Sequence, residues 1–509
     1  MLSKVLSAAH FGLDTVPIEV EVNVFSKGFP GFSIIGLPNK AVDEARERVK
    51  TALTNSGIDF PQAKIIVNLA PADLPKEGAG FDLPIAVGIL HSLEAVILPE
   101  KALFYGELSL DGSLRHTKGV FLMAVNAKKF GVKHLFVPRE SANEAAVIPG
   151  VHVYPVSTIT ELVEHLNNTQ QIKPLKAKAQ LRPEKIFVPE FDFSEIIGQE
   201  QAKRALMIAA AGAHNVFMQG PPGSGKTMLA RAFAGILPPL SHEEALEVTK
   251  IYSVTGNIPP GESLVLERPF RVSHHTTSRI GLIGGGSNPH PGEISMAHLG
   301  VLFLDEFPEF SRSTLEALRQ PIEDGQVSIT RAAGSITFPA DFTLIAAANP
   351  CPCGYLGDSK RECTCSPRQI MKYQSKLSGP LMDRIDLHIN VPTVEVDKLI
   401  PNTKMKVTAD SQMIREKVIR ARNIQAKRFK GTKLYANAMM KNKHIKDFVK
   451  IDEDAMVMLK QAVNAYNLSA RTYFRLIKVS QTIADLEVTT SVTSTHVAEA
   501  LQYRIRSSQ

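Results

Sequence analysis

The stretch that most constrains this chain of 509 residues runs from Gly220 to Thr227 and reads G-P-P-G-S-G-K-T. The pattern G-x-x-x-x-G-K-[ST] is typical of a phosphate-binding loop, in which glycines let backbone N–H groups face phosphate oxygens. The apolar run 215–219 before it predicts a buried strand, and Met228 to Leu237 predicts a helix. A glycine-rich turn that binds nothing is the alternative. The flanking strand and helix favour nucleotide binding, because a helix N-terminus attracts phosphate.

Each residue of this loop has an expected role. Lys226 is expected to contact the β- and γ-phosphates, and Thr227 to bind Mg²⁺ through its hydroxyl group. The backbone of the other positions is expected to surround the phosphates, and these positions are Gly220, Pro221, Pro222, Gly223, Ser224 and Gly225. We therefore expect ATP and Mg²⁺ as cofactors.

Length and composition indicate a globular protein of several domains. Hydrophobic residues make up 44% of the chain and charged residues 21%, and 509 residues are too many for one core. No apolar run is long enough to cross a membrane, and the N-terminus has no apolar segment with a cleavage site. We therefore expect a cytoplasmic protein without a membrane partner.

Two later apolar runs end in polar residues, as strands at a nucleotide site do. The run from Val301 ends in Asp305 and Glu306. Burying unpaired carboxylates is costly, so their presence at the end of an apolar strand indicates a function. Asp305 is expected to hold Mg²⁺ and Glu306 to deprotonate the attacking water. A strand that runs out into a polar loop is the alternative. The second run, 342–348, ends in Asn349.

The order of these motifs resembles that of AAA+ ATPases. The resemblance implies that Asn349 helps to position the attacking water. It also implies that Phe193 to Gln199 packs against adenine, with Ile196, Ile197 and Gly198 as the candidates for that pocket. A plain helix start with hydrophobic packing is the alternative for this segment.

Leu381 to Leu387 resembles the L-x-x-R-[FI]-D segment of the magnesium chelatase and MCM branch of AAA+ proteins. The resemblance implies that Arg384 is an arginine finger that enters the nucleotide site of the neighbouring subunit. An ion pair between Arg384 and Asp383 or Asp386 is the alternative.

The segment from Ser469 to Lys478 resembles the sensor 2 region of the same proteins. Arg471 is the candidate for a phosphate contact. Arg475 lies four residues further on the same helix face, and it either shares that role or pairs with an acid.

Two segments between these motifs resemble the pore loops of the chelatase and MCM branch. The first is 268–291, with His274 and His275, and the second is 324–338, with Arg331 at the tip of a predicted β-hairpin. In ring-shaped members such loops line the central pore, so these three residues are the candidates for DNA contact. Structural insertions that make subunit contacts are the alternative.

All four cysteines of the chain lie in one Gly/Pro-rich loop and form the pattern C-x-C-x₉-C-x-C. Four thiolates on two short segments can bind Zn²⁺ tetrahedrally, so we expect a structural zinc site. Reduced cysteines without a metal are the alternative. The expected ligands are Cys351, Cys353, Cys363 and Cys365.

Positive charge is concentrated between residues 401 and 450, where 14 Lys and Arg stand against 3 Asp and Glu. Such a block indicates a polyanionic partner. A predicted helix from Ser411 to Phe429 carries part of it, with Ile414, Val418, Ala421 and Ile424 as its core face. A solvated helical face is the alternative reading of the charge.

Alternating strand and helix patterns over residues 1–166 predict an α+β domain. Leu74–Gly80 and Gly106–Gly112 resemble the proteolytic domain of Lon. The serine position of that domain corresponds here to Gly80, and its lysine positions to Phe121 and Met123. A serine–lysine pair is therefore missing, and we expect a scaffold or interaction module.

Taken in order, the chain resembles the ComM/YifB-type magnesium chelatase-like AAA+ ATPases. The resemblance implies an α/β motor with a Lon-like N-terminal domain and a C-terminal helical lid, and an ATP-driven hexamer. It also implies a DNA helicase for branch migration in natural transformation and homologous recombination, with recombination proteins as further partners. The implied boundaries are 1–166, a linker 167–190, the ATPase core 191–394 and the helical domain 395–509.

Two other functions are weighed against this one. The first is a chelatase-like motor that remodels a protein partner and does not move along DNA. The second is an ATP-dependent protease, which the residues at the serine and lysine positions disfavour.

Overall fold

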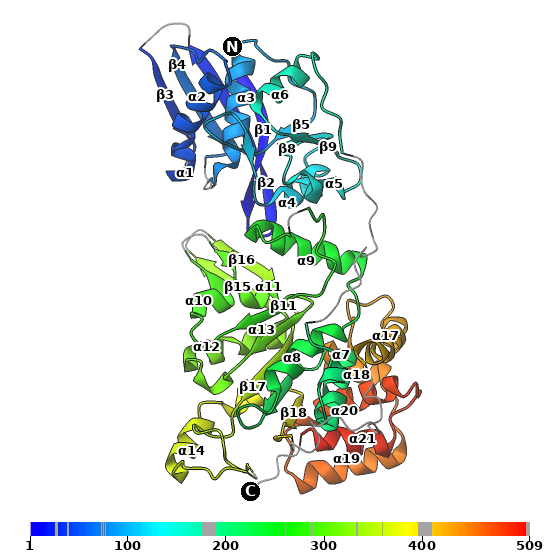
Figure 1. The fold of residues 1–509 in the computed structure, drawn as a ribbon. Coiled ribbons are helices and arrows are strands. Elements are labelled where there is room, and N and C mark those ends of the chain that lie inside the picture. The colour runs from blue at the N-terminus through cyan, green and yellow to red at the C-terminus, as the bar shows by residue number, and fades with distance from the viewer. Residues whose placement is uncertain are drawn as a thin grey trace. The chain divides into compact units, whose positions relative to one another are not determined.

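The computed structural model describes residues 2–504 apart from 26–28, 38–39, 73, 75, 77, 176–189, 260, 287–288, 332–333, 359 and 395–409. Most of the predicted linker 167–190 therefore lies outside the described residues. The chain divides into two compact units, coloured by residue number in Figure 1. Unit 1 consists of Met1–Arg182 and Ser241–Leu266, and unit 2 of Pro183–Leu240 and Glu267–Gln509.

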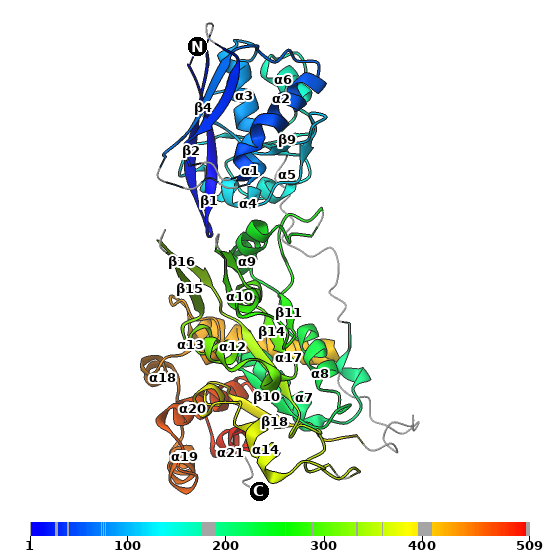
Figure 2. The same cartoon turned by 90° about the vertical axis from the view of Figure 1, so that its left-hand side faces the viewer.

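The first sheet of unit 1 has the strand order β1-β2-β4-β3. Its strands are β1 (Leu2–Phe11), β2 (Asp14–Phe25), β3 (Gly31–Ile35) and β4 (Lys64–Ala70), and β3 alone of these runs parallel to its neighbour. Ile18, Val20 and Val22 are buried at alternate positions of β2, because α3 (Asp82–Ser92) packs across β1 and β2. Figure 2 shows the helices on one side of this sheet. The analysis of the sequence did not predict β1.

The rest of unit 1 adds a parallel three-stranded sheet with the order β5-β8-β9. The helical segment 40–55 is interrupted at Glu44, between α1 and α2. The further elements are α1 (Lys40–Asp43), α2 (Ala45–Asn55), a 3₁₀ turn (Ala79–Phe81), β5 (Ala102–Phe104), the hairpin β6 (Glu107–Leu108) and β7 (Leu114–Arg115), α4 (Val120–Ala127), β8 (His134–Pro138), α5 (Ala142–Ala146), β9 (His152–Val156) and α6 (Ile159–Leu166).

Helix α9 (His242–Thr255) belongs to unit 1 although it lies between motifs of the ATPase core in the sequence. Its backbone carbonyl at Ser253 accepts a hydrogen bond of 3.0 Å from the Gly119 amide. Phe121 and Leu122 of α4 are fully buried and pack with apolar residues of 246–266. The boundary predicted at residue 191 placed this segment in the core, and local patterns could not reveal that it covers α4.

Unit 2 contains a parallel five-stranded sheet with the order β11-β14-β17-β10-β18. Every residue of β14 and β17 is buried, as expected for a sheet with helices on both faces. The predicted α/β class is thus confirmed. The strands are β10 (Val216–Gln219), β11 (Phe270–Ser273), β14 (Val301–Leu304), β17 (Thr343–Ala348) and β18 (Leu387–Asn390).

Two hydrophobic clusters cover the two faces of this sheet. Val216 and Met218 of β10 belong to the cluster with α7 and α8, and Phe217 belongs to the opposite one. The surrounding elements are a 3₁₀ turn (Phe193–Glu195), α7 (Glu200–Gly212), α8 (Lys226–Gly235), α10 (Arg279–Ile283), β12 (Gly284–Gly285), β13 (His290–Pro291), α11 (Glu293–Met296), a 3₁₀ turn (Phe307–Glu309), α12 (Arg312–Ala317), α13 (Arg319–Asp324), the hairpin β15 (Gln326–Arg331) and β16 (Gly334–Pro339), α14 (Pro367–Gln374) and α15 (Gly379–Met382).

The end of unit 2 is helical, as predicted, and its helices lie beside α7 (Figure 1). Helix α20 packs against both α7 and α17. The predicted core positions Ile414, Val418 and Ala421 of α17 are buried, whereas Ile424 is half-buried. The elements are α17 (Ser411–Arg428), a 3₁₀ turn (Asn437–Met439), α18 (Asn442–Phe448), α19 (Glu453–Ala465), α20 (Ala470–Leu486) and α21 (Ser494–Gln502).

Candidate functional site

The predicted phosphate loop connects the end of β10 to the start of α8. Gly223 and Gly225 have φ values of 74° and 90°, which only glycine adopts readily. A Cβ atom on either residue would meet nothing within 4 Å, so open space lies over the loop. A Cβ on Gly220 would lie 2.1 Å from the Val391 carbonyl oxygen, which explains the glycine there. This open, glycine-lined turn at a helix N-terminus fits a phosphate group.

The Lys226 side chain is buried and folds back over the loop. Its ammonium group donates hydrogen bonds to the carbonyl oxygens of Gly220 (2.8 Å) and Pro221 (2.9 Å) and to Asn349 Oδ1 (3.2 Å). Burial lowers the pKa of Lys226 to about 8, although the Asp305 carboxylate acts in the opposite direction. Lys226 and Asn349, which follow two neighbouring strands, thus come together as the sequence predicts.

The predicted Mg²⁺ ligands also lie together. Thr227 donates a hydrogen bond of 3.0 Å from its hydroxyl to Asp305 Oδ2. Asp305 follows β14, and its other oxygen accepts a hydrogen bond of 2.9 Å from the Glu306 amide. A hydroxyl and a carboxylate beside a phosphate loop are the oxygen donors that Mg²⁺ takes together with a nucleotide. These residues therefore fit a Mg²⁺ ion.

Glu306 is half-exposed at the end of β14, and its backbone lies in the left-handed region (φ 50°, ψ 44°). Few residues other than glycine adopt this conformation, and those that do often lie at functional sites. The His275 Nδ1 atom lies 2.8 Å from Glu306 Oε2, and the ring of His274 lies beside that of His275. The histidines predicted to contact DNA in a pore therefore lie beside Glu306, the predicted catalytic base, in this structure.

The residues of the segment predicted to pack on adenine differ in their burial. Ile196 is buried in the core with Phe193, whereas Ile197 and Gly198 are half-exposed. Gln199, which the sequence analysis did not single out, donates hydrogen bonds to the Pro392 carbonyl (2.6 Å) and the Ser224 carbonyl (3.4 Å). The segment thus contacts the phosphate loop through Gln199.

Arg384 and Arg471 meet on one carboxylate that sequence patterns did not indicate. Arg384 is mostly buried, and its guanidinium pairs with Glu323 Oε2 and donates 2.8 Å to the Pro380 carbonyl. Arg471 donates 3.2 Å to Glu323 Oε1. Among the described residues, no hydrogen bond or ion pair joins either arginine to the phosphate loop. Arg384 is thus paired with neither of the acids that the alternative named.

Asp383 and Asp386, the acids on either side of Arg384, have other partners. Asp383 lies 3.4 Å from Arg504 Nη2, and Asp386 pairs with Arg475 and lies 3.3 Å from His214 Nδ1. Burial by itself raises the pKa of Asp386, but the charge of Arg475 and the hydrogen bond with His214 lower it by more than burial raises it. The pKa of Asp386 therefore lies below its usual range. Of the two roles considered for Arg475, pairing with an acid is the one observed.

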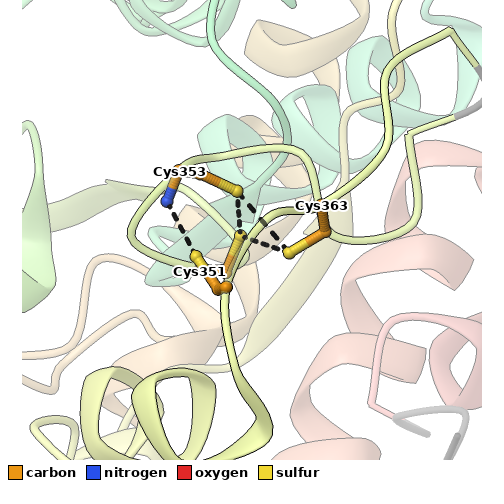
Figure 3. A group of neighbouring side chains, drawn as sticks. Cys351, Cys353 and Cys363 are labelled. Carbon is orange, nitrogen blue, oxygen red and sulfur yellow. Dashed lines mark hydrogen bonds between the residues drawn. The ribbon is translucent and has the colours of Figure 1, made fainter.

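The four cysteines converge, and Figure 3 shows three of them with their sulfur atoms turned toward one another. The sulfur of Cys351 lies 3.3 Å from that of Cys353 and 3.6 Å from that of Cys363. The Cys353 amide donates to Cys365 Sγ at 3.3 Å, and all four sulfurs lie within 4.8 Å of one another. Thiolates bound to Zn²⁺ at about 2.3 Å are about 3.8 Å apart, so the cluster fits zinc.

We expect about one Zn²⁺ per chain in protein purified without chelators, measured by atomic emission. Cys363→Ser and Cys365→Ser should each lower the bound zinc severalfold, because a hydroxyl is a poor ligand for this ion. Thr364→Ser, between these two cysteines, is the matched control and should keep its zinc. Unchanged zinc in both cysteine variants would show that the cluster is not the metal site.

The basic block is only partly a free surface. Arg422 of α17 donates to the Ala210 carbonyl (3.2 and 3.0 Å), and Arg428 pairs with Asp485 of α20. These two arginines hold helices together. Residues 401–409 lie outside the described residues, as does the side chain of Arg331, although β15 and β16 form the predicted hairpin.

The N-terminal positions that the resemblance to Lon assigns to a protease dyad have no room for one. A Cβ on Gly80 would lie 2.3 Å from the Tyr105 ring, so a serine side chain has no room there. Phe121 and Met123 of α4 are fully buried. No helix among the described residues is long and apolar enough to cross a membrane.

Comparisons with known proteins match these features. Three family models cover most of the chain: "Magnesium chelatase, subunit ChlI" over 192–399, "Subunit ChlI of Mg-chelatase" over 20–141 and "Magnesium chelatase, subunit ChlI C-terminal" over 408–504. The chain is 44% identical to competence protein ComM of Haemophilus influenzae, over 99% of this chain and 97% of that protein. It is 42% identical to YifB of Escherichia coli, with the same coverage.

A more distant relative is the magnesium-chelatase 38 kDa subunit of Rhodobacter capsulatus, 28% identical over 32% of this chain and 51% of that protein. Such a family implies ATP and Mg²⁺, in agreement with the phosphate loop and the carboxylates beside it. The order of the motifs, the parallel sheet and the near full-length identity all agree. The chain therefore belongs to the ComM/YifB family of magnesium chelatase-like AAA+ ATPases.

Proposed function

We propose that this protein is an oligomeric ATPase that hydrolyses ATP between neighbouring subunits. The supporting observation is the division of the site. Lys226, Thr227, Asp305, Glu306 and Asn349 form one cluster, while both candidate arginines are held by Glu323 and not at that cluster. A phosphoryl-transfer site needs positive charge on the transferring group, and a second subunit can supply it. In a ring, most simply a hexamer, Arg384 and Arg471 of each subunit would face the nucleotide site of the neighbouring subunit.

Each residue then has a definite task. The loop amides and Lys226 bind the phosphates, Thr227 and Asp305 hold Mg²⁺, and Glu306 takes the proton from the attacking water. Bound Mg²⁺ neutralises charge on the phosphates. Asn349, whose amide side chain contacts Lys226, keeps the lysine and the water in place.

We further propose that the motor acts on DNA and that it works in the cytoplasm. The similarity to a relative named competence protein and the excess of positive charge between 401 and 450 support this. Branch migration during transformation and recombination is the specific activity proposed, together with recombination proteins as partners. The Arg331 hairpin remains the candidate for DNA contact.

The test is to measure ATP turnover with a Holliday junction, duplex and single-stranded DNA, and to follow strand exchange on the junction. We expect DNA to stimulate turnover and strand exchange to require ATP. Stimulation should decrease steeply with salt, because phosphate contacts release counterions. ATP turnover that no DNA form alters would reject the DNA motor.

That last outcome would favour the second candidate, a chelatase-like ATPase that remodels a protein partner. The similarity to the 38 kDa chelatase subunit supports this candidate. A protease is not proposed, because the Tyr105 ring occupies the place of a serine side chain at Gly80.

A further inference from the structure

The four-cysteine loop touches the phosphate loop. It begins two residues after Asn349, and its residue Gly354 is buried with φ 89°. A Cβ on Gly354 would lie 2.5 Å from Cδ and 2.7 Å from Cγ of Pro222, and 3.8 Å from the Asn349 side chain. Real Cβ contacts are never that short, so the backbone of the cysteine loop rests directly on the proline ring.

The position of Gly354 depends on the cysteines. Its amide donates 3.0 Å to the Cys351 carbonyl, which closes a turn that contains the first two cysteines. The amide of Cys353, within that turn, donates to Cys365 Sγ. The cluster therefore fixes the turn from both ends of the loop.

Pro222 is well suited to receive this contact. Proline has a fixed φ and a rigid ring, so displacing the ring displaces the backbone on both sides. On one side is the Pro221 carbonyl, which accepts a hydrogen bond from Lys226, and on the other is Gly223. Pro222 is otherwise exposed, so Gly354 supports a part of the phosphate loop that the core does not cover.

We propose that the four-cysteine loop is a positioning element for nucleotide binding, and that it acts through contact of Gly354 with Pro222. The cluster shapes the turn, the turn places Gly354, and Gly354 limits how far the Pro221–Gly223 backbone can move. Loss of the metal then weakens nucleotide binding although no cysteine touches the nucleotide. This inference depends on the proposal above that the phosphate loop binds ATP.

Gly354→Ala tests the contact, and Gly357→Ala is its matched control. Both glycines lie in the same loop with positive φ, 89° and 77°, so both exchanges strain the backbone. A Cβ at Gly357 meets nothing within 4 Å, whereas one at Gly354 meets Pro222. We expect Gly354→Ala to weaken binding of a fluorescent ADP analogue at least about tenfold and Gly357→Ala less than about threefold.

Pro222→Ala provides a rescue, because it removes the two ring atoms that a Cβ at Gly354 would strike. We expect the double variant to bind ADP more tightly than Gly354→Ala alone, which a loss of folding could not produce. Equal affinities for Gly354→Ala and Gly357→Ala, or a double variant no better than Gly354→Ala, would overturn the proposal.

The link to the metal is tested with Cys365→Ser, for which the bound zinc and the ADP affinity are measured on the same samples. We expect both to fall together, with kcat at saturating ATP changed less than KM. Zinc-free protein with unchanged ADP affinity would overturn the link to the cluster. If the unaltered protein bound no nucleotide at all, the proposed ATPase function itself would fail, so the two failures are distinguishable.

Discussion

Glu306→Gln should bind ATP with unchanged affinity and assemble normally, yet lose turnover by about 10²- to 10⁴-fold, the usual contribution of a general base. Glutamine has the shape of glutamate, so the left-handed backbone at this residue and the hydrogen bond that its amide donates to Asp305 are retained. What is lost is a group that can accept a proton from water. Phosphate release under saturating ATP, fluorescent nucleotide titration and size-exclusion chromatography measure the three properties separately.

The control for this variant is Glu309→Gln. Glu309 lies three residues further, at the end of the 3₁₀ turn Phe307–Glu309, and it pairs with Lys376 at 2.9 Å. An exposed pair of this kind contributes little, so turnover should stay near that of the unaltered protein. Strand exchange should stop in Glu306→Gln and continue in the control. Near-normal turnover in Glu306→Gln would show that another group activates the water.

Arg384→Ala should lower kcat about 10³-fold or more, the scale of an arginine finger, with little change in the ATP affinity of each subunit. The observed partner of Arg384 is compatible with such a role. The pair that Arg384 forms with Glu323 is half-exposed on the carboxylate side, where ion pairs are weak. A phosphate from a neighbouring subunit offers more negative charge and bidentate geometry, so it should displace Glu323.

Mixing distinguishes action across the interface from action within one chain. Lys226→Ala and Arg384→Ala should each be nearly inactive alone. In a mixed ring, a Lys226→Ala subunit still carries Arg384, which should act at the intact phosphate loop of an Arg384→Ala neighbour. Random mixing in equal amounts in a ring should restore about one interface in four. If Arg384 acted in its own subunit, every site would still lack one residue, and no activity would return.

The double variant Lys226→Ala/Glu309→Gln serves as the mixing control, because Glu309→Gln is not expected to affect any nucleotide site. Activity recovered with Arg384→Ala should not differ between Lys226→Ala and this double variant. Recovery should also disappear on dilution below the concentration at which rings assemble, which light scattering detects.

The sequence predicted those parts of the site that local patterns encode. The phosphate loop and the acidic end of β14 have fixed residue types at fixed spacing, because strand, turn and helix must follow one another to present amides and carboxylates. Asn349 could be placed because it ends an apolar run that follows the acidic strand in the order seen in AAA+ ATPases, and in the sheet this strand, β17, lies between β14 and β10. The helical C-terminal segment was also predictable, and three of the four core positions predicted for α17 are buried.

What the sequence could not reveal are pairings between distant segments. Glu323 joins Arg384 and Arg471 across 61 and 148 residues, and no periodicity marks it. His275 was assigned to a pore because its segment resembles the pore loops of the chelatase and MCM branch, yet β11 lies beside β14 and brings His275 to Glu306. Gly354 looked like one loop glycine among several until the position of Pro222 was known.

The path of the backbone around α9 has a practical consequence for dissecting this protein. The chain leaves unit 2 after Leu240, contributes a helix to unit 1, and returns at Glu267. A truncated protein that begins near residue 190 would thus contain α9 without its apolar partners around Phe121. The apolar face of α9 would then be exposed to solvent. An isolated motor has to be made by excising both stretches and rejoining Leu240 to Glu267 through a short bridge.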